Sequence, residues 1–320
     1  MPSPIRAAAM PTRSGVGRLT ALLVAPALAL ALAGAAPCAA QATWFPRTPL
    51  FRSPLAAPHA PRFAGAFVVT DIVRPEVAVN PPERPPFLIN EPAASELMAV
   101  VNLGGSYGIY RAPWGPGQIE VGGQVGMDTR FRMKLPQKDM FSADWMVAGA
   151  VSTAQGPWTV RARAIHRSSH MGDQFLQATE RLGEPAHRIQ LGNDGFDLYG
   201  ARGLGPVRLY AGGEWIAYSE TDVEVLAPGE ADRWQGQAGF DADWQAWRRS
   251  PQWSVVGGLD WQSAQRTGWR PSFAAEAGVQ FRHGDRSARL VLRGFDGASE
   301  VFQFFRTNEK FVGLELVVAP

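Results

Sequence analysis

Residues 233–245, RWQGQAGFDADWQ, decide the fold because apolar and polar side chains alternate along them. In an extended chain one face carries Trp, Gly, Ala, Phe, Ala and Trp, and the other carries mostly Arg, Gln and Asp. Since successive side chains of a strand point to opposite sides, this period of two predicts a strand with one apolar and one polar face. Trp234 and Trp244 stand at the two ends of the apolar face, as aromatic girdles at two membrane interfaces require.

The same alternation recurs along the chain, for example in 252–262, 272–282 and 312–318. The segments run to roughly 9–13 residues, the length of a tilted strand that crosses a bilayer, whereas soluble strands usually have about 5–6. Their polar faces carry too many charges for a dry sandwich core but suit a polar lumen. The predicted strands lie near residues 62–70, 97–111, 118–128, 144–153, 157–169, 194–202, 207–217, 232–244, 252–262, 271–282, 287–296 and 310–319.

The connections between these segments alternate strictly between short and long. Tight periplasmic turns and longer outer loops alternate in this way in bacterial barrels, which also have an even number of strands. The sequence therefore predicts an all-β fold, an antiparallel up-and-down transmembrane β-barrel of about 12 strands with both termini on the periplasmic side. One feature departs from the pattern, because the chain ends in Val318-Ala319-Pro320 and not in an aromatic residue.

Residues 1–42 are typical of a secretory signal peptide, with three arginines, an apolar run and the small-x-small site Ala40-Gln41-Ala42. Cleavage before Thr43 is expected, with a cut after Ala40 as the alternative. Residues 43–61 are rich in proline and predict an irregular periplasmic lead-in, and residues 62–320 form the barrel domain. We therefore expect export to the outer membrane, with outer-membrane lipid and the barrel-assembly machinery as partners.

Composition excludes several classes of function. The chain has 31 Lys and Arg against 29 Asp and Glu, and three of the arginines lie in the leader, so the mature part is close to neutral. No basic block with interleaved aromatics occurs, so we expect no binding to nucleic acid. Cys38 is the only cysteine and also lies in the leader, which leaves the mature chain without a thiol for a disulfide, a zinc site or a nucleophile.

Residues 166–175, HRSSHMGDQF, resemble the HxSSHxGDxF motif of the bacterial family called domain of unknown function 1207. The segment 49–63, with Pro-Leu-Phe at its start, is similar to the beginning of that family, and 303–314, with Gln-Phe-Phe at its start, is similar to its end. The resemblance covers nearly the whole mature chain. It implies an outer-membrane barrel-like protein and carries no assigned activity.

The motif also contains a pair that could carry chemistry. On the predicted strand 158–169 the even positions face lipid, because the odd positions hold arginines, so His166 and Ser168 lie two apart on the outer side. An imidazole beside a hydroxyl is the minimum for an activated serine nucleophile. Outer-membrane phospholipase A and the lipid A deacylase carry a similar His-x-Ser pair, although those enzymes favour Asn at the next position, where this chain has Ser169.

A third group would have to orient the histidine. Asn193 and Asp197 are the leading candidates, with Asp194 and Asp173 as others. The alternative is structural, since polar residues at the end of a barrel strand also occur where lipid gives way to headgroups. In that case the pair holds the following loop, and Ser169, His170, Gly172 and Asp173 structure its turn. His166, His170 and Asp173 form a weak metal signal without a fourth ligand, so no metal site is expected.

Arginines mark the lumen face of two predicted strands, at Arg161, Arg163, Arg167, Arg289 and Arg293. They predict either an anion-friendly pore or a plug in which they pair with lumen acids, and the near-equal charge counts favour the plug. The first functional hypothesis is therefore a structural or passively conducting barrel. The second is a lipid-ester hydrolase. No cofactor is expected, except calcium if the chain is a hydrolase, and the oligomeric state is left open.

Overall fold

The computed structural model describes residues 42–71, 95–134, 138–173, 191–220, 233–245, 252–305 and 307–319. The predicted signal peptide lies outside the described residues except for Ala42. In these parts of the chain no helix is long and apolar enough to cross a membrane. The strands are β1 (Thr43–Trp44), β2 (Phe63–Thr70), β3 (Glu96–Trp114), β4 (Gly117–Arg132), β5 (Met140–Gln155), β6 (Trp158–Met171), β7 (Leu191–Leu204), β8 (Val207–Glu220), β9 (Trp234–Trp244), β10 (Trp253–Ala264), β11 (Pro271–His283), β12 (Arg286–Ala298) and β13 (Asn308–Ala319), with two short 3-10 helices, η1 (Gln265–Thr267) and η2 (Phe302–Phe304).

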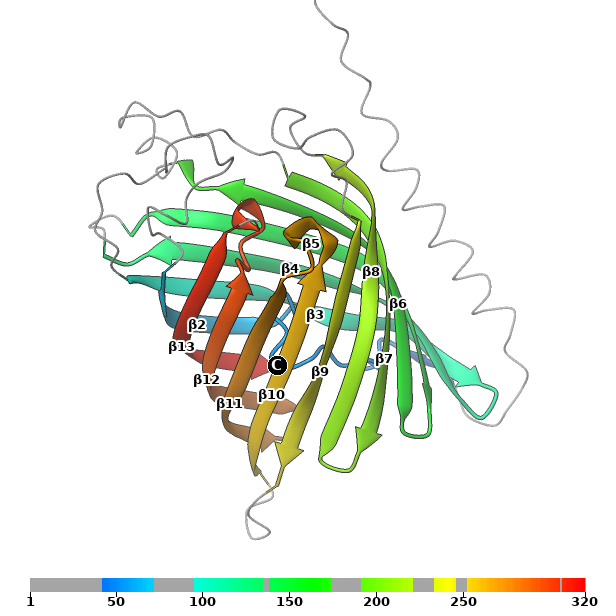
Figure 1. The fold of residues 1–320 in the computed structure, drawn as a ribbon. Coiled ribbons are helices and arrows are strands. Elements are labelled where there is room, and N and C mark those ends of the chain that lie inside the picture. Colours follow the sequence, from blue (N-terminus) through cyan, green and yellow to red (C-terminus); the bar gives the residue numbers. More distant parts are fainter. Residues whose placement is uncertain are drawn as a thin grey trace, which may run out of the picture.

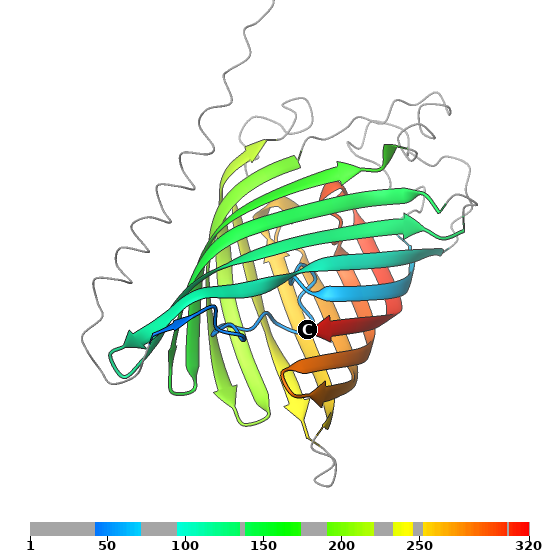
Figure 2. The same cartoon turned by 180° about the vertical axis from the view of Figure 1, so that it is seen from behind.

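Strands β2 to β13 form a closed antiparallel barrel of twelve strands (Figure 1, Figure 2). Each strand pairs with its sequence neighbours, and β13 pairs with β2 to close the ring, while β1 adds two residue pairs to the side of β3. Closure gives every wall strand a hydrogen-bonded neighbour on both sides, which a chain in lipid requires because no water is present to satisfy the backbone. The predicted fold class is confirmed.

All twelve predicted strands are present. The predicted strict alternation of short and long connections is wrong at one place, because the connection between β9 and β10 (245–252) is longer than the one between β10 and β11 (265–270). The strand ends that lead into the long connections lie together at one end of the barrel, at the top of Figure 1, where η1 and η2 are also found. Several wall strands are longer than predicted, with 19 residues in β3 and 16 in each of β4 and β5. The pairing of these strands continues past the segments in which apolar and polar residues alternate, so the alternation did not predict their full length.

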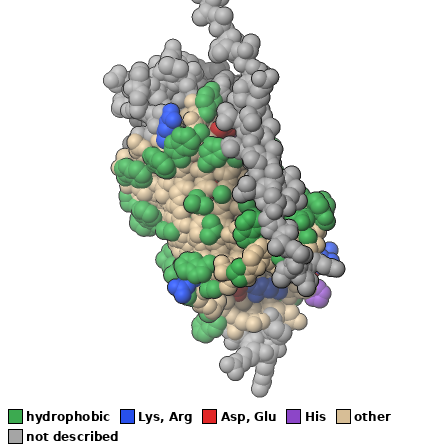
Figure 3. Space-filling view, turned by 90° about the vertical axis from the view of Figure 1, so that its right-hand side faces the viewer, with side chains coloured by type: hydrophobic (Ala, Val, Ile, Leu, Met, Phe, Trp, Pro, Cys, Tyr) green, Lys and Arg blue, Asp and Glu red, His purple; other side chains and the backbone are tan. Residues whose placement is uncertain are grey.

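The outer face of the wall is apolar and the inner face is polar. In β13 Val312, Leu314 and Leu316 are about half exposed on the outside, whereas Glu315 between them is 2% exposed. The space-filling view shows hydrophobic side chains across the middle of one face, with charged side chains near its upper and lower ends (Figure 3). This distribution is the reverse of a soluble protein and matches a wall that faces lipid.

Ion pairs fill much of the interior. Arg130 bonds Glu300 at 2.9 Å and also Glu309, and Arg293 contacts Glu300 at 2.6 Å and Glu315 at 3.4 Å. Such pairs tolerate burial because each guanidinium meets carboxylates directly. Further pairs of this kind are Arg62–Glu276, Arg62–Glu315, Arg289–Glu276, Arg111–Glu120 and Arg208–Asp241.

The proline-rich lead-in differs from its prediction, because residues 50–62 lie inside the barrel and not in a periplasmic extension. The backbone N–H of Leu50 donates to Glu120 Oε1 at 3.0 Å, and that of Leu55 donates to Asp241 Oδ1 at 2.8 Å. Phe51 is only 1% exposed. A chain without strand pairing needs partners for its backbone when buried, and here carboxylates on the lumen face supply them.

The connection between β12 and β13 also enters the lumen, from the end of the barrel to which the long connections belong. It carries η2, whose three residues are buried, and Phe304 stacks on Phe141 of β5 with ring centroids 5.1 Å apart. The lead-in meets this connection inside the barrel, where the ring of His59 stacks on Phe302 at 4.4 Å. We call residues 50–62 and 299–305 together the plug.

The plug leads to a direct electrical prediction. The refolded protein is expected to give no steady current above bare lipid in a planar bilayer, because ion pairs and plug residues occupy the described lumen. The measurement is single-channel conductance at fixed potential and moderate salt. A stable open conductance from the unaltered chain would show that a continuous aqueous path crosses the barrel.

Candidate functional site on the outer wall

The two faces of strand β6 carry different side chains, because successive residues point alternately outward and into the lumen. His166 and Ser168 lie on its outer face, and Arg167 and Ser169 point into the lumen. The placement of His166 and Ser168 on the lipid side therefore agrees with the pattern of the sequence. The pair lies toward the end of β6 from which the long connection to β7 leaves, away from the tight turn that precedes Trp158.

A carboxylate on the neighbouring strand orients the histidine. Asp194 of β7 is the cross-strand partner of His166, and its Oδ1 lies 2.8 Å from His166 Nδ1. The two side chains are 46% and 30% exposed, so the contact sits at the outer surface. A carboxylate that accepts the Nδ1 proton fixes the tautomer of the ring and leaves Nε2 as the basic nitrogen.

The register changes beside Asp194. Across the β7–β8 ladder Asp194 pairs with Tyr218 but the next residue, Gly195, pairs with Ile216, so Ala217 has no opposite residue. This is a β-bulge, a feature that re-aims side chains and terminates regular pairing near active sites. Tyr218 is 52% exposed on the same outer surface. The bulge therefore lies next to the carboxylate that contacts the histidine.

Ser168 lies two residues from His166 on the same face, which places the two Cα atoms about 6.6 Å apart along the strand. Its partner on β5 is Trp145, which is half exposed. Among the described residues no hydrogen bond joins the Ser168 hydroxyl to the imidazole. Catalytic hydrogen bonds are often long before substrate binds, so this spacing still allows Ser168 to act with His166.

The two orienting residues that sequence reasoning favoured lie on the wrong side of the wall. Asn193 is buried and accepts a hydrogen bond from Ser219 at 2.6 Å, and Asp197 binds Arg163 inside the lumen. Each is an odd number of positions from Asp194, so each points away from His166. Asp194, which was also a candidate in the sequence, is the residue that contacts His166, and the register of β7 against β6 places it there.

The inner face of the motif strand holds the plug. Ser169 donates to Asp144 of β5, Asp144 Oδ2 accepts the backbone N–H of Phe302 at 3.1 Å, and Gln303 Nε2 donates to the carbonyl of Ser169 at 2.8 Å. Arg167 pairs with Glu214 and lies 5.9 Å from the ring centroid of Phe302. The motif segment, the lead-in and the connection between β12 and β13 thus meet in one cluster on the inner face of the strand that carries His166 and Ser168.

The rest of the motif lies at the end of β6. His170 is exposed and pairs across the ladder with Ala143. Gly172 approaches the backbone of β5 so closely that a Cβ atom there would meet the carbonyl oxygen of Met140 at 1.8 Å, so only glycine fits. Asp173 is the last described residue before the connection to β7, and the rest of that predicted loop lies outside the described residues.

The lumen arginines singled out in the sequence contact acids in the structure. Arg163 donates to Asp197 at 2.9 Å, and Arg161 lies 3.7 Å from the same carboxylate and 4.5 Å from the ring centroid of Phe51. Arg289 pairs with Glu276 at 3.1 Å. Within the described parts of the chain no three His, Cys, Asp or Glu side chains are grouped for a metal ion.

A closed antiparallel barrel with an apolar exterior and a charged interior defines the class of outer-membrane β-barrel proteins. The chain belongs to the family described as protein of unknown function (DUF1207), whose model matches residues 87–318. No curated protein matches it in sequence.

Solved structures with a similar fold include outer-membrane phospholipases. The Salmonella typhi outer membrane phospholipase dimer with bound calcium has 13% identity and a TM-score of 0.52, covering 82% of this chain and 91% of that one. The Escherichia coli outer membrane phospholipase A has 12% identity and a TM-score of 0.52, covering 82% and 93%. An active-site mutant of the latter, with an asparagine replaced by alanine, has 13% identity and a TM-score of 0.51, covering 85% and 93%. These likenesses show a shared barrel fold.

Proposed function

We propose that this chain is an outer-membrane lipid acyl hydrolase with Ser168 as nucleophile, His166 as general base and Asp194 as the residue that orients the histidine. The observation that carries the proposal is the 2.8 Å contact between His166 Nδ1 and Asp194 Oδ1, two residues along the outer face from a serine. A nucleophile, a base and an orienting acid in this order form the arrangement that activates a hydroxyl.

The chemistry runs in two steps. Ser168 Oγ attacks the ester carbonyl of a lipid while His166 Nε2 takes its proton, and the lysolipid alcohol leaves with that proton, which yields an acyl-serine. Water, deprotonated by the same nitrogen, then attacks the acyl-serine, the bond to Ser168 Oγ breaks to release the fatty acid, and the proton on His166 returns to Ser168 Oγ. Asp194 stabilises the imidazolium that forms in each step.

The surroundings suit a substrate that stays in the membrane. The site lies on the lipid-facing side of the wall, with Trp145 beside Ser168 and Val147 beside His166, each about half exposed. An acyl chain can therefore reach the serine without leaving the bilayer. The substrate class is an ester lipid of the outer membrane, a phospholipid or an acyl chain of lipid A.

Several further expectations belong to this proposal. The chain is exported by its signal peptide and inserted in the outer membrane by the barrel-assembly machinery. Since the similar Salmonella typhi phospholipase is a dimer with bound calcium, calcium and oligomeric state are variables of the assay. The alternative is a purely structural barrel. The filled lumen supports that alternative over passive conduction.

Acyl release by the refolded protein tests the proposal. We expect fatty acid to be released from phospholipid vesicles or from lipid A, with and without calcium, and we expect Asp194→Ala to lower the rate by about 100-fold or more because the histidine loses its fixed tautomer. The matched control is Asp296→Ala, which removes an exposed carboxylate that pairs with Lys310 on distant strands. No release from either lipid under any of these conditions would leave the structural barrel as the function.

A further inference from the structure

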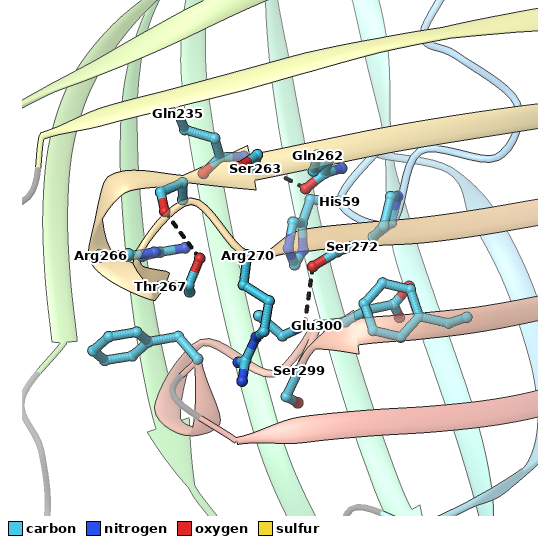
Figure 4. Close-up of a pocket in the computed structure, with 15 residues that line it drawn as sticks. His59, Gln235, Gln262, Ser263, Arg266, Thr267, Arg270, Ser272, Ser299 and Glu300 are labelled. Carbon is cyan, nitrogen blue, oxygen red and sulfur yellow. Dashed lines mark hydrogen bonds between the residues drawn. The ribbon is translucent and has the colours of Figure 1, made fainter.

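A small cavity lies inside the barrel beneath the long connections. Its volume is about 40 Å³, and η1 and the connection that carries η2 border it. Figure 4 shows the side chains that line it, which come from β9 to β12, from these two connections and from the lead-in. Those that matter here are His59, Gln262, Arg266, Ser272 and Glu300.

Arg266 brings a positive charge that the described chain does not balance. Its Nε atom is buried without a hydrogen-bond partner, and none of the ion pairs among the described residues includes it. The carboxylate that attracts it, Glu214, is already bonded to Arg167, so two arginines share one acid. The guanidinium of Arg266 lies 5.2 Å from the ring centroid of Phe305 and 5.9 Å from that of Phe302. Burial lowers the pKa of Arg266 to about 10, which leaves it protonated at neutral pH.

The acid that lines the cavity is already engaged. Glu300 contacts Arg130 at 2.9 Å and Arg293 at 2.6 Å, so it belongs to the charge cluster on the other side. Burial holds the pKa of His59 well below its usual value, so this ring is neutral at pH 7. A buried charge without its own counter-ion is unfavourable, and the cavity beside Arg266 is where a counter-ion would compensate it.

The remaining lining offers hydrogen-bond donors. Ser272 Oγ accepts the backbone N–H of Ala298 at 2.9 Å, which leaves its own proton to be donated. The side chains of Gln235 and Gln262 also line the cavity (Figure 4). Gln262 Nε2 donates to Asp260 Oδ1 at 2.9 Å and Gln235 Nε2 to Gln262 Oε1 at 3.5 Å, so each amide has one further N–H to donate. The cavity has room for about three water molecules. A guanidinium fork with hydroxyl and amide donors is the usual protein environment of a phosphate group.

We propose that this cavity is a phosphate-binding site in which Arg266 supplies the charge and Ser272 a hydrogen bond. The phosphate is either the free ion or the phosphate of a lipid headgroup that enters from the end with the long connections. The site is separate from Ser168, His166 and Asp194, which lie on the outer face of the wall, so it does not depend on the proposed hydrolase activity.

Calorimetric titration of the refolded full chain in a detergent without phosphate tests the site. Inorganic phosphate is titrated at constant ionic strength in one arm, and glycerol 3-phosphate in a second arm. We expect one saturable site per chain. Stronger binding of glycerol 3-phosphate points to a lipid headgroup, and stronger binding of inorganic phosphate points to the free ion.

Arg266→Met is expected to weaken binding by at least tenfold, and Arg266→Lys by less, because it keeps the charge but loses the fork. The control Arg202→Met removes an exposed arginine of the outer wall that stacks on Trp158, and binding should be unchanged. Folding of each variant is checked by its heat-dependent electrophoretic shift. Absence of saturable binding by the unaltered chain, or binding by folded Arg266→Met as tight as that of the unaltered chain, would overturn the proposal.

Discussion

Replacing Ser168 with alanine is expected to reduce acyl release from lipid by about 1,000-fold or more while the barrel stays folded. The hydroxyl is the atom that forms the acyl intermediate, so its loss removes the covalent route and leaves only what the rest of the site contributes. Ser168 is on the outer face and takes no part in the described lumen network. The measurement is the initial rate of fatty-acid release, with folding followed by heat-dependent electrophoretic mobility.

Two histidines of the same strand provide a variant and its control for this test. His166→Ala should lower the rate as strongly as Ser168→Ala, because the two residues act as a unit. His170→Ala changes a second exposed histidine of the same strand that the described structure does not place beside Asp194, and the rate should stay within about twofold. Full activity in folded Ser168→Ala would exclude this serine as the nucleophile.

Replacing Arg130 with methionine is expected to lower the free energy of unfolding by about 3–5 kcal/mol. Arg130 is 1% exposed and pairs with Glu300 and Glu309, so its removal leaves two buried carboxylates with one fewer positive partner. The measurement is equilibrium unfolding in urea in the presence of lipid vesicles.

The control for that variant is Arg282→Met. Arg282 pairs with Asp243, but both side chains are 35% exposed, and an ion pair with that access to solvent is worth at most about 1 kcal/mol. If the two variants were equally stable, the lumen around Arg130 would have to be hydrated. The charge cluster would then not be the element that holds the plug in place.

Most of the wall could be predicted from the sequence because its signal is local. A strand such as β9 shows its two faces within 11 residues, and the loop lengths reveal which strands begin and end together. Arginines at every second position of β6 also identified which of its faces points into the lumen. These inferences need only the period of the side chains and the thickness of a bilayer.

The candidate site could be predicted only in part because its third member depends on register. His166 and Ser168 are on one strand, so their shared face follows from their spacing. Asp194 comes from the next strand, and a shift of one residue in the pairing would have brought Asn193 opposite His166. The plug was missed for a related reason, since its proline-rich chain has no period and its partners lie far away in the sequence.

Strand β2 is the shortest in the wall, with 8 residues, and it closes the ring by pairing with β13 on one side and β3 on the other. Side-chain bonds reinforce this junction from within, because Thr70 donates to Glu309 of β13 at 3.0 Å and Arg62 contacts Glu315 of β13 at 3.1 Å. The two plug segments immediately precede β2 and β13 in the chain. The residues that fill the interior are therefore covalently tied to the two strands whose pairing closes the wall.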